Sequence, residues 1–163
     1  MTKFFTVLSL LLLISLPAIA ADKKGVELKS TAEVDIMVKN DKGGSEVIRV
    51  EAASAHVAPG DTVIFSTHYA YYGEQPATDV VINNPLPEHM LYLDGTAEGK
   101  GTRIEFSVDK GQTFAAANKL TIKDKEGKER PATAADYTHI RWTIEGALQN
   151  GAKGSVSFKA KVK

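Results

Sequence analysis

Apolar and polar residues alternate along the C-terminal segment of the chain, residues 155–162. Its apolar positions are Val156, Phe158, Ala160 and Val162. Serine and lysine fill the positions between them, so one face of the segment is apolar and the other is polar. A period of two residues with one charged face is typical of an antiparallel strand that has one side in water. We therefore expect such a strand at the end of the chain.

Two further segments alternate in the same way. Residues 61–71 read DTVIFSTHYAY. The residues expected on the inner face of this segment are Val63, Phe65, Thr67 and Tyr69, with Ile64, Ser66 and His68 outside. Residues 137–146 read YTHIRWTIEG. Here the alternation places Ile140, Trp142 and Ile144 inside, and Trp142 is expected in the core.

The rest of the chain reads as short strands and turns. Runs of β-branched and aromatic residues bounded by Gly, Pro, Asn or Asp occur at 77–87, 90–93, 102–109 and 118–124. Only residues 115–120 and 132–137 favour helix, each over about one turn. Many short strands joined by turns predict an all-β fold, an immunoglobulin-like antiparallel β-sandwich of about seven to nine strands. An up-and-down barrel is the alternative.

The N-terminal part has two elements of its own. Lys3, an apolar run and a small-residue site at Ala18–Ala20 predict a signal peptide at residues 1–20, cleaved after Ala20. The apolar run is shorter than the ~20 residues of a spanning helix, so no membrane insertion is expected after cleavage. Residues 31–40 and 45–54 flank DKGG, which predicts a hairpin with its turn at Asp41, Gly43 and Gly44.

Composition narrows the class of protein further. The chain holds 20 basic and 20 acidic residues, and this balance gives no electrostatic footprint for nucleic acid. It has no cysteine, so a disulfide framework is excluded. With the signal peptide, these features predict a protein of the periplasm of a Gram-negative bacterium, or a secreted one. No cofactor is expected.

The order of signals after Val57 resembles a known bacterial family. Residues 57–93 begin VAPGDTVIF and continue to a proline-rich NNPLP, residues 106–114 read FSVDKGQTF, and HIRWTI precedes a glycine-bearing turn and the final strand. This set is similar to the DUF11-type repeat domain, a module of surface and secreted proteins. The resemblance covers about residues 55–163, and residues 21–54 form a preceding strand or hairpin segment. It implies an immunoglobulin-like fold and a structural or adhesive role, with no catalytic residues.

The segment FSVDKGQTF also resembles the Asp-box hairpin of sialidases. Asp109 is able to accept backbone N–H bonds within its own turn, and Gly111 is free to adopt a positive φ. Phe106 and Phe114 are expected to pack together at the core. Those roles explain the motif without a substrate, and a propeller of at least about four blades of ~40 residues does not fit in this chain. We therefore interpret Asp109 and Gly111 as structural turn residues and expect no enzyme.

A metal site is the first alternative function. His89 and Met90 form a pair that copper(I) is able to use, which would make the protein a periplasmic carrier of copper or a small ligand together with His56 and His68. However, no two histidines have the close spacing of a metal motif. Surface histidines are the simpler interpretation.

Aromatic residues give the second alternative. The loop after residue 70 reads YYGEQPA, where the DUF11-type pattern has a polar turn, so Tyr71 and Tyr72 are candidate binding residues, as in a carbohydrate-binding module. Packing over the rim of the sandwich is the other interpretation. The first hypothesis is nevertheless a non-enzymatic module that binds an unidentified envelope or surface protein. The segment before residue 55 is its candidate docking strand, by β-addition.

Overall fold

The computed structural model describes residues 25–41 and 43–163. The signal peptide predicted at residues 1–20 lies outside these described residues. Within them the chain forms eleven strands and two short 3₁₀ helices, and it confirms the all-β sandwich. The strand number exceeds the expected seven to nine because several strands have only two or three residues.

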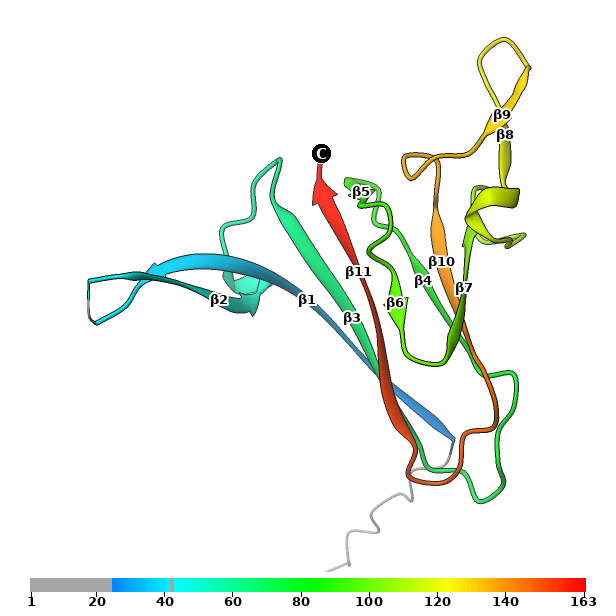
Figure 1. Cartoon of the computed structure of the whole chain (residues 1–163), viewed down its shortest axis with the longest axis horizontal. Helices are drawn as coiled ribbons and strands as arrows, with labels where there is room; N and C mark the ends of the chain where they lie inside the picture. Colours follow the sequence, from blue (N-terminus) through cyan, green and yellow to red (C-terminus); the bar gives the residue numbers. More distant parts are fainter. Residues whose placement is uncertain (1–24, 42) are drawn as a thin grey trace, which may run out of the picture.

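The larger sheet has the strand order β2-β1-β3-β11-β5, and β6 also pairs with β11. The strands of this sheet are β1 (Val26–Lys39), β2 (Ser45–Glu51), β3 (Thr62–Tyr71), β5 (Met90–Tyr92), β6 (Glu98–Gly99) and β11 (Lys153–Val162). All of their pairings are antiparallel. The final strand β11 therefore lies next to β3, far from it in sequence (Figure 1).

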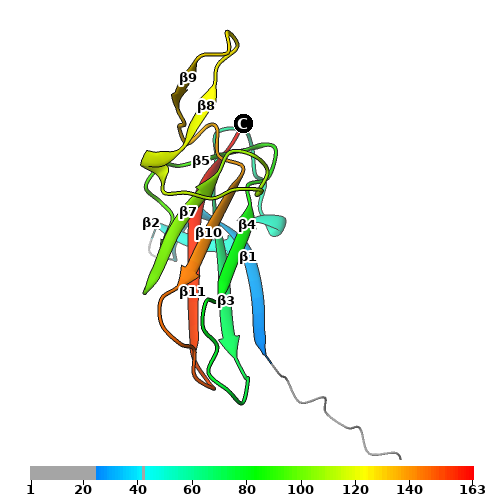
Figure 2. The same cartoon turned by 90° about the vertical axis from the view of Figure 1, so that its right-hand side faces the viewer.

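The smaller sheet has three strands in the order β4-β10-β7 and forms the second layer, as Figure 2 shows. Its strands are β4 (Val81–Pro85), β7 (Thr102–Ser107) and β10 (His139–Ile144). A separate hairpin projects beyond it, made of β8 (Thr121–Lys123) and β9 (Glu129–Pro131) (Figure 1). The 3₁₀ helices are η1 (Ala52–Ser54) and η2 (Ala117–Lys119). The segment 132–137 forms turns in place of the helical turn favoured by its sequence.

The core lies between the two sheets and follows most of the alternation of the sequence, but Ile64, expected outside, is buried at 7% exposed. Trp142 and Phe158 are fully buried from opposite layers, with ring centroids 6.2 Å apart. Phe65 stacks on Phe158 at 4.9 Å within the larger sheet. Thr67 is a buried polar residue of this interior, and its hydroxyl pairs with Ser30 Oγ at 3.1 Å and with Asn84 Nδ2 at 3.0 Å. These bonds satisfy the hydroxyl and connect the two layers.

The N-terminal strand is part of the sandwich for most of its length. β1 pairs with β3 over nine residues, from Val26 opposite Tyr71 to Val34 opposite Val63. Beyond Val34 the only strand that pairs with it in the described chain is β2, and the two strands project away from both layers as a hairpin (Figure 1). At the base of this hairpin, Asp35 and Ile36 line a pocket together with the loop at His56 and Val57. We call residues 35–49 the arm. The sequence places this hairpin correctly but does not reveal that its strand begins at Val26.

Candidate functional site

The arm ends in a turn of defined geometry. Asn40 N–H donates to the Gly44 carbonyl at 2.9 Å, and Gly43 N–H donates to the Asn40 carbonyl at 3.0 Å. Gly43 has φ +78°, a conformation that costs glycine least. The Asn40 side chain also accepts the Gly44 N–H at 2.9 Å. The turn residues predicted from DKGG thus close a hairpin in which β1 and β2 pair over seven residues.

The apolar side chains of the arm lie on both of its faces and remain exposed. Ile36 lies opposite Ile48 on one face, and each is 37% exposed. Met37 lies opposite Val47 on the other face, and these are 74% and 63% exposed. Side chains of this kind normally pack under a second layer, because a two-stranded hairpin alone is only marginally stable. In this arm, neither sheet of the described chain provides that layer.

The outer edge of β2 carries backbone groups directed away from β1. Along an antiparallel ladder, hydrogen-bonded pairs of opposite residues alternate with non-hydrogen-bonded pairs. Asn40 and Gly44 form a hydrogen-bonded pair, and this determines which residues of β1 and β2 bond to each other. Ile48 and Val50 therefore bond to β1, whereas Val47 and Arg49 direct their N–H and C=O groups outward. β2 is the last strand of its sheet among the described residues. An exposed edge of this length is a template for pairing with another strand.

An ion pair crosses the base of the arm. Arg49 Nε donates to Asp35 Oδ1 at 2.7 Å, and Arg49 Nη2 donates to Asp35 Oδ2 at 3.0 Å. The hydrogen bond from Arg49 is the main cause that lowers the pKa of Asp35 below its usual value. The two-pronged contact fixes the relative position of the strands. The arm therefore leaves the sandwich with a set register.

Exposed large apolar side chains of the described chain are concentrated on three strands. The large hydrophobic residues exposed in the described chain are Val26, Leu28, Ile36, Met37, Val47, Ile48 and Val81. All of them belong to β1, β2 or β4, and six belong to the hairpin strands β1 and β2. The sequence contains a signal for this surface, the apolar runs IMV and VIRV, but periodicity alone assigns such residues to a core.

Of the two interpretations of the candidate tyrosines, the structure favours packing over the rim of the sandwich for Tyr71. Tyr71 is the last residue of β3 and only 7% exposed, and its hydroxyl donates to the Gln75 carbonyl. A Cβ on Gly73 would overlap the Tyr71 ring, so the loop folds closely over it. Tyr72 is half-buried, and its N–H donates to the Gly25 carbonyl at 2.8 Å. Tyr71 therefore packs at the rim and does not provide an exposed aromatic surface, because its parity along β3 points it inward.

The candidate metal ligands lie on separate elements. His68 is on β3, His56 follows η1, and His89 precedes Met90 at the start of β5. The three histidines are exposed and Met90 is half-buried. Among residues 25–41 and 43–163, no three histidine, cysteine or acidic side chains gather in a way that would hold a metal ion. The carrier hypothesis gains no geometric support from this arrangement.

Asp109 organises the turn of the segment FSVDKGQTF. Its Oδ1 accepts the backbone N–H groups of Gln112 and Thr113 at 3.1 and 2.9 Å, and its Oδ2 accepts the Thr113 hydroxyl at 2.6 Å. The Ser107 hydroxyl donates to Oδ1 at 2.7 Å. The hydrogen bonds from Thr113 are the main cause that holds the pKa of Asp109 well below its usual range. Gly111 has φ +82°. All of these contacts lie within the turn.

The two phenylalanines of this segment do not pack together, which corrects an expectation. Phe106 is buried against Tyr137, with ring centroids 4.5 Å apart. Its partner across the turn is Ala115, so the neighbouring Phe114 has the opposite parity and faces outward. There the Arg141 guanidinium carbon lies 4.1 Å from the Phe114 ring centroid, a cation–π contact.

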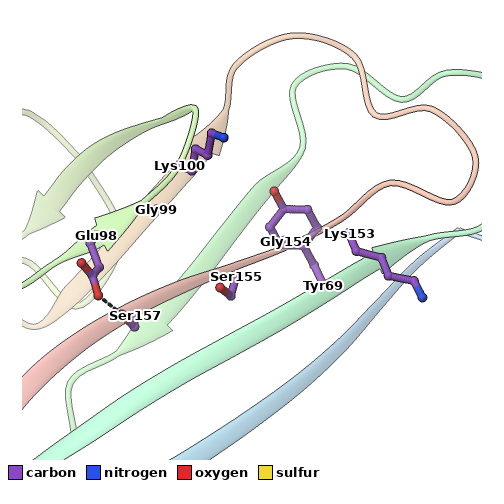
Figure 3. Close-up of a pocket in the computed structure, with 8 residues that line it drawn as sticks. All are labelled: Tyr69, Glu98, Gly99, Lys100, Lys153, Gly154, Ser155 and Ser157. Carbon is purple, nitrogen blue, oxygen red and sulfur yellow. Dashed lines mark hydrogen bonds between the residues drawn. The ribbon is translucent and has the colours of Figure 1, made fainter.

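A groove of about 430 Å³ lies beside β6 and β11 (Figure 3). The Tyr69 side chain lies over Gly154, where a Cβ would overlap its hydroxyl. The Ser157 hydroxyl donates to Glu98 Oε1 at 2.9 Å. Figure 3 shows Lys100 and Lys153 on opposite sides of the Tyr69 ring, with Lys153 extending away from Lys100. The charged groups of the groove do not converge on one point, so it is a weaker candidate site than the arm.

Comparisons with known proteins assign no relative to the chain. No family model matches it, and neither a curated protein nor a solved structure matches it significantly. The resemblance to the DUF11-type domain therefore stays a prediction. In the described part of the chain, no helix has the length and apolar character needed to cross a bilayer.

Proposed function

We propose that this chain is an exported, non-enzymatic structural or binding module of the bacterial periplasm or cell surface. It acts by protein–protein interaction, and the arm is its docking element. The sandwich, proposed to be immunoglobulin-like, holds the arm away from the body. We propose export because residues 1–20 have the pattern of a signal peptide. We propose no reaction because Asp109 has a structural role in its own turn.

The observation that carries this proposal is the exposed apolar surface of the arm. Met37 and Val47 are the two most exposed large apolar residues of the described chain, and they lie side by side. Contiguous exposed apolar side chains mark interaction surfaces in soluble proteins. The free edge of β2 adds main-chain donors and acceptors to the same surface. β-Addition uses both features together, because the backbone supplies affinity and the alternate side chains supply specificity.

Removal of the arm alone tests the proposal. Val34 and Val50 form a hydrogen-bonded pair, so replacement of residues 35–49 by Asn-Gly closes the shortened hairpin with a preferred two-residue turn. Val34 is also the last residue of β1 that pairs with β3, so the sandwich keeps every pairing between these two strands. The tagged full chain and this variant are produced in a Gram-negative host and cross-linked in intact cells.

The second projecting hairpin provides the matched control. Asp124 N–H bonds to the Lys128 carbonyl, which makes Ile122 and Arg130 a hydrogen-bonded pair. Replacement of residues 123–129 by Asn-Gly therefore shortens an equally exposed hairpin in the same way. We expect cross-linked protein species to disappear with the arm and to persist in the control. Species that persist unchanged without the arm would refute the proposal.

A further inference from the structure

We propose that the partner of the arm is a second copy of this chain, bound through antiparallel pairing of the two β2 edges about a two-fold axis at Ile48. This inference rests on the proposed function of the arm. The resulting sheet has the order β3-β1-β2-β2-β1-β3 across the two copies. The two-stranded arm becomes the four-stranded centre of one continuous sheet, which removes the marginal stability of an isolated hairpin.

The hydrogen-bond phase of β2 permits this pairing. The groups that point outward belong to the odd residues Ser45, Val47, Arg49 and Glu51. In an antiparallel ladder, the outward residues of one strand must lie opposite outward residues of the other. A two-fold axis at Ile48 places Val47 opposite Arg49 of the second copy, and Arg49 opposite its Val47. Each outward N–H and C=O group then meets a partner.

The register is fixed by strand length. β2 has seven residues, Ser45–Glu51, and Ile48 is its middle residue. Only the register centred on Ile48 pairs the whole strand with its copy. The opposite pairs are then Ser45 with Glu51, Glu46 with Val50, Val47 with Arg49, and Ile48 with Ile48. No like charges lie directly opposite each other in this set.

Neighbouring registers are less favourable for reasons of charge and polarity. A shift that centres the axis on Arg49 places the two Arg49 side chains opposite each other, and like charges at that position are destabilising. A shift to Val47 places Ile48 opposite Glu46, which separates the isoleucines. The length of β2, its charges and its apolar positions together therefore favour the register centred on Ile48.

The side chains gain an apolar row across the interface. Ile36 lies opposite Ile48 within each arm. Pairing at Ile48 joins these residues into a row of four isoleucines, Ile36-Ile48-Ile48-Ile36. On the other face, the aliphatic stem of Arg49 lies over Val47 of the second copy, while its guanidinium keeps the Asp35 contact. Both β2 edges are consumed, so the assembly closes as a dimer and does not extend into a fibre.

Two substitutions at one position test the charge pattern. Val47→Lys and Val47→Glu both remove the exposed apolar side chain, and residue 47 faces Arg49 of the second copy in the proposed dimer. We expect the full chain to sediment as a dimer, Val47→Lys to raise the dissociation constant about tenfold or more, and Val47→Glu to leave it within a few-fold. A monomeric wild-type chain at high micromolar concentration, or equal losses in both variants, would overturn the inference.

Cysteine cross-linking tests the axis directly, because the natural chain has no cysteine. Directly opposite residues at a non-hydrogen-bonded position have Cα atoms about 4.5 Å apart, within the range of a disulfide. Ile48→Cys should therefore form a disulfide-linked dimer under mild oxidation. Val47→Cys is the control. Residue 47 of the second copy lies two residues further along its strand, so the two Cα atoms are more than about 7 Å apart, too far for a disulfide. Cross-linking of Val47→Cys as fast as Ile48→Cys would contradict the two-fold axis.

The outcomes also separate this inference from the proposed function. Arm-dependent cross-linked species that contain another protein and no second copy would overturn the inference and leave the proposed function standing. Species that are independent of the arm would overturn both.

Discussion

Two turns of this chain carry the same tripeptide, Asp-Lys-Gly, at residues 41–43 and 109–111. In both turns the glycine has a positive φ, +78° at Gly43 and +82° at Gly111. The turn at Asp109 is anchored to the sandwich, because the neighbouring Phe106 lies in the core and Lys110 N–H donates to Thr138 Oγ1. The turn at Asp41 closes an arm that projects beyond both sheets (Figure 1).

The difference teaches that the same turn tripeptide does not determine what a hairpin does. A glycine at positive φ reverses the chain in both places. The side chain that accepts backbone N–H groups differs, however: it is Asn40 in the arm turn and Asp109 in the other. The surroundings then decide whether the strands of the hairpin bury their apolar residues or expose them. β7 is covered by the larger sheet, and the distal part of β1 is not. One turn therefore serves stability, and the other is available for binding.

The largest effect is expected from truncating an apolar residue beside each turn. Phe106→Ala removes a buried ring that packs on Tyr137 and should cost about 3–5 kcal/mol. Met37→Ala in the arm should cost below about 1 kcal/mol in the monomer, because the Met37 side chain is 74% exposed. Urea unfolding at low protein concentration measures both values. Equal losses would show that the arm is packed as tightly as the sandwich.

Alanine at the two glycines gives a smaller difference. Both substitutions introduce a Cβ at positive φ, at about 1–2 kcal/mol each. At Gly111 the Cβ would also lie 3.3 Å from the His139 ring, whereas at Gly43 it would have open space among the described residues. Gly111→Ala should therefore be the more destabilising variant in thermal unfolding. The reverse order would indicate that the arm turn is the more constrained one.

Acid sensitivity tests the role of Asp109 in its turn. The lowered pKa of Asp109 means that its contribution to stability is present above the unfolded pKa of about 4 and is lost as pH falls toward the folded value. Asp109→Asn should flatten the fall in urea midpoint between about pH 5 and pH 2. Part of the fall in urea midpoint should remain in this variant. Arg130 also lowers the pKa of Asp136, so Asp136 contributes to the acid dependence as well. Asp41→Asn is the matched control, and an equal flattening in that variant would contradict the assignment to Asp109.

The smallest effect on stability is expected from removing the arm. The Asn-Gly replacement of residues 35–49 leaves all nine pairs between β1 and β3 in place. Its free energy of unfolding should lie within about 1 kcal/mol of the wild-type monomer. Chemical denaturation below the dimer concentration range provides the measurement. A large loss would mean that the arm supports the fold rather than a partner.

The alternation of apolar and polar residues predicted much of this fold, because most strands have one face in the core and one face in water. The alternation through Val156, Phe158 and Ala160 and around Trp142 marks the faces that bury their side chains. Turn chemistry likewise placed the hairpin at Asp41. These features depend on residues close together in sequence, where local rules apply.

The remaining features depend on contacts between distant segments. Whether Ile36 and Ile48 meet a second layer is decided by where β3 begins, and the arm sequence does not contain that information. The alternation of residues 61–71 was enough to predict that Tyr71 points inward, but it did not predict the loop that closes over the Tyr71 ring. Phe114 was misplaced because the turn pairs Phe106 with Ala115, which reverses the expected face. The exposed apolar surface proposed as a docking site thus results from the difference in extent between the large sheet and the small one.

The continuity of β1 has a mechanical consequence. One strand, Val26–Lys39, runs from the sandwich into the arm without interruption. Tension applied along this strand reaches its nine register pairs with β3 together, so they resist it in shear. Tension applied across the strand would instead peel the pairs apart one after another. The nine pairs should therefore resist a pull along this part of β1 better than a pull across it.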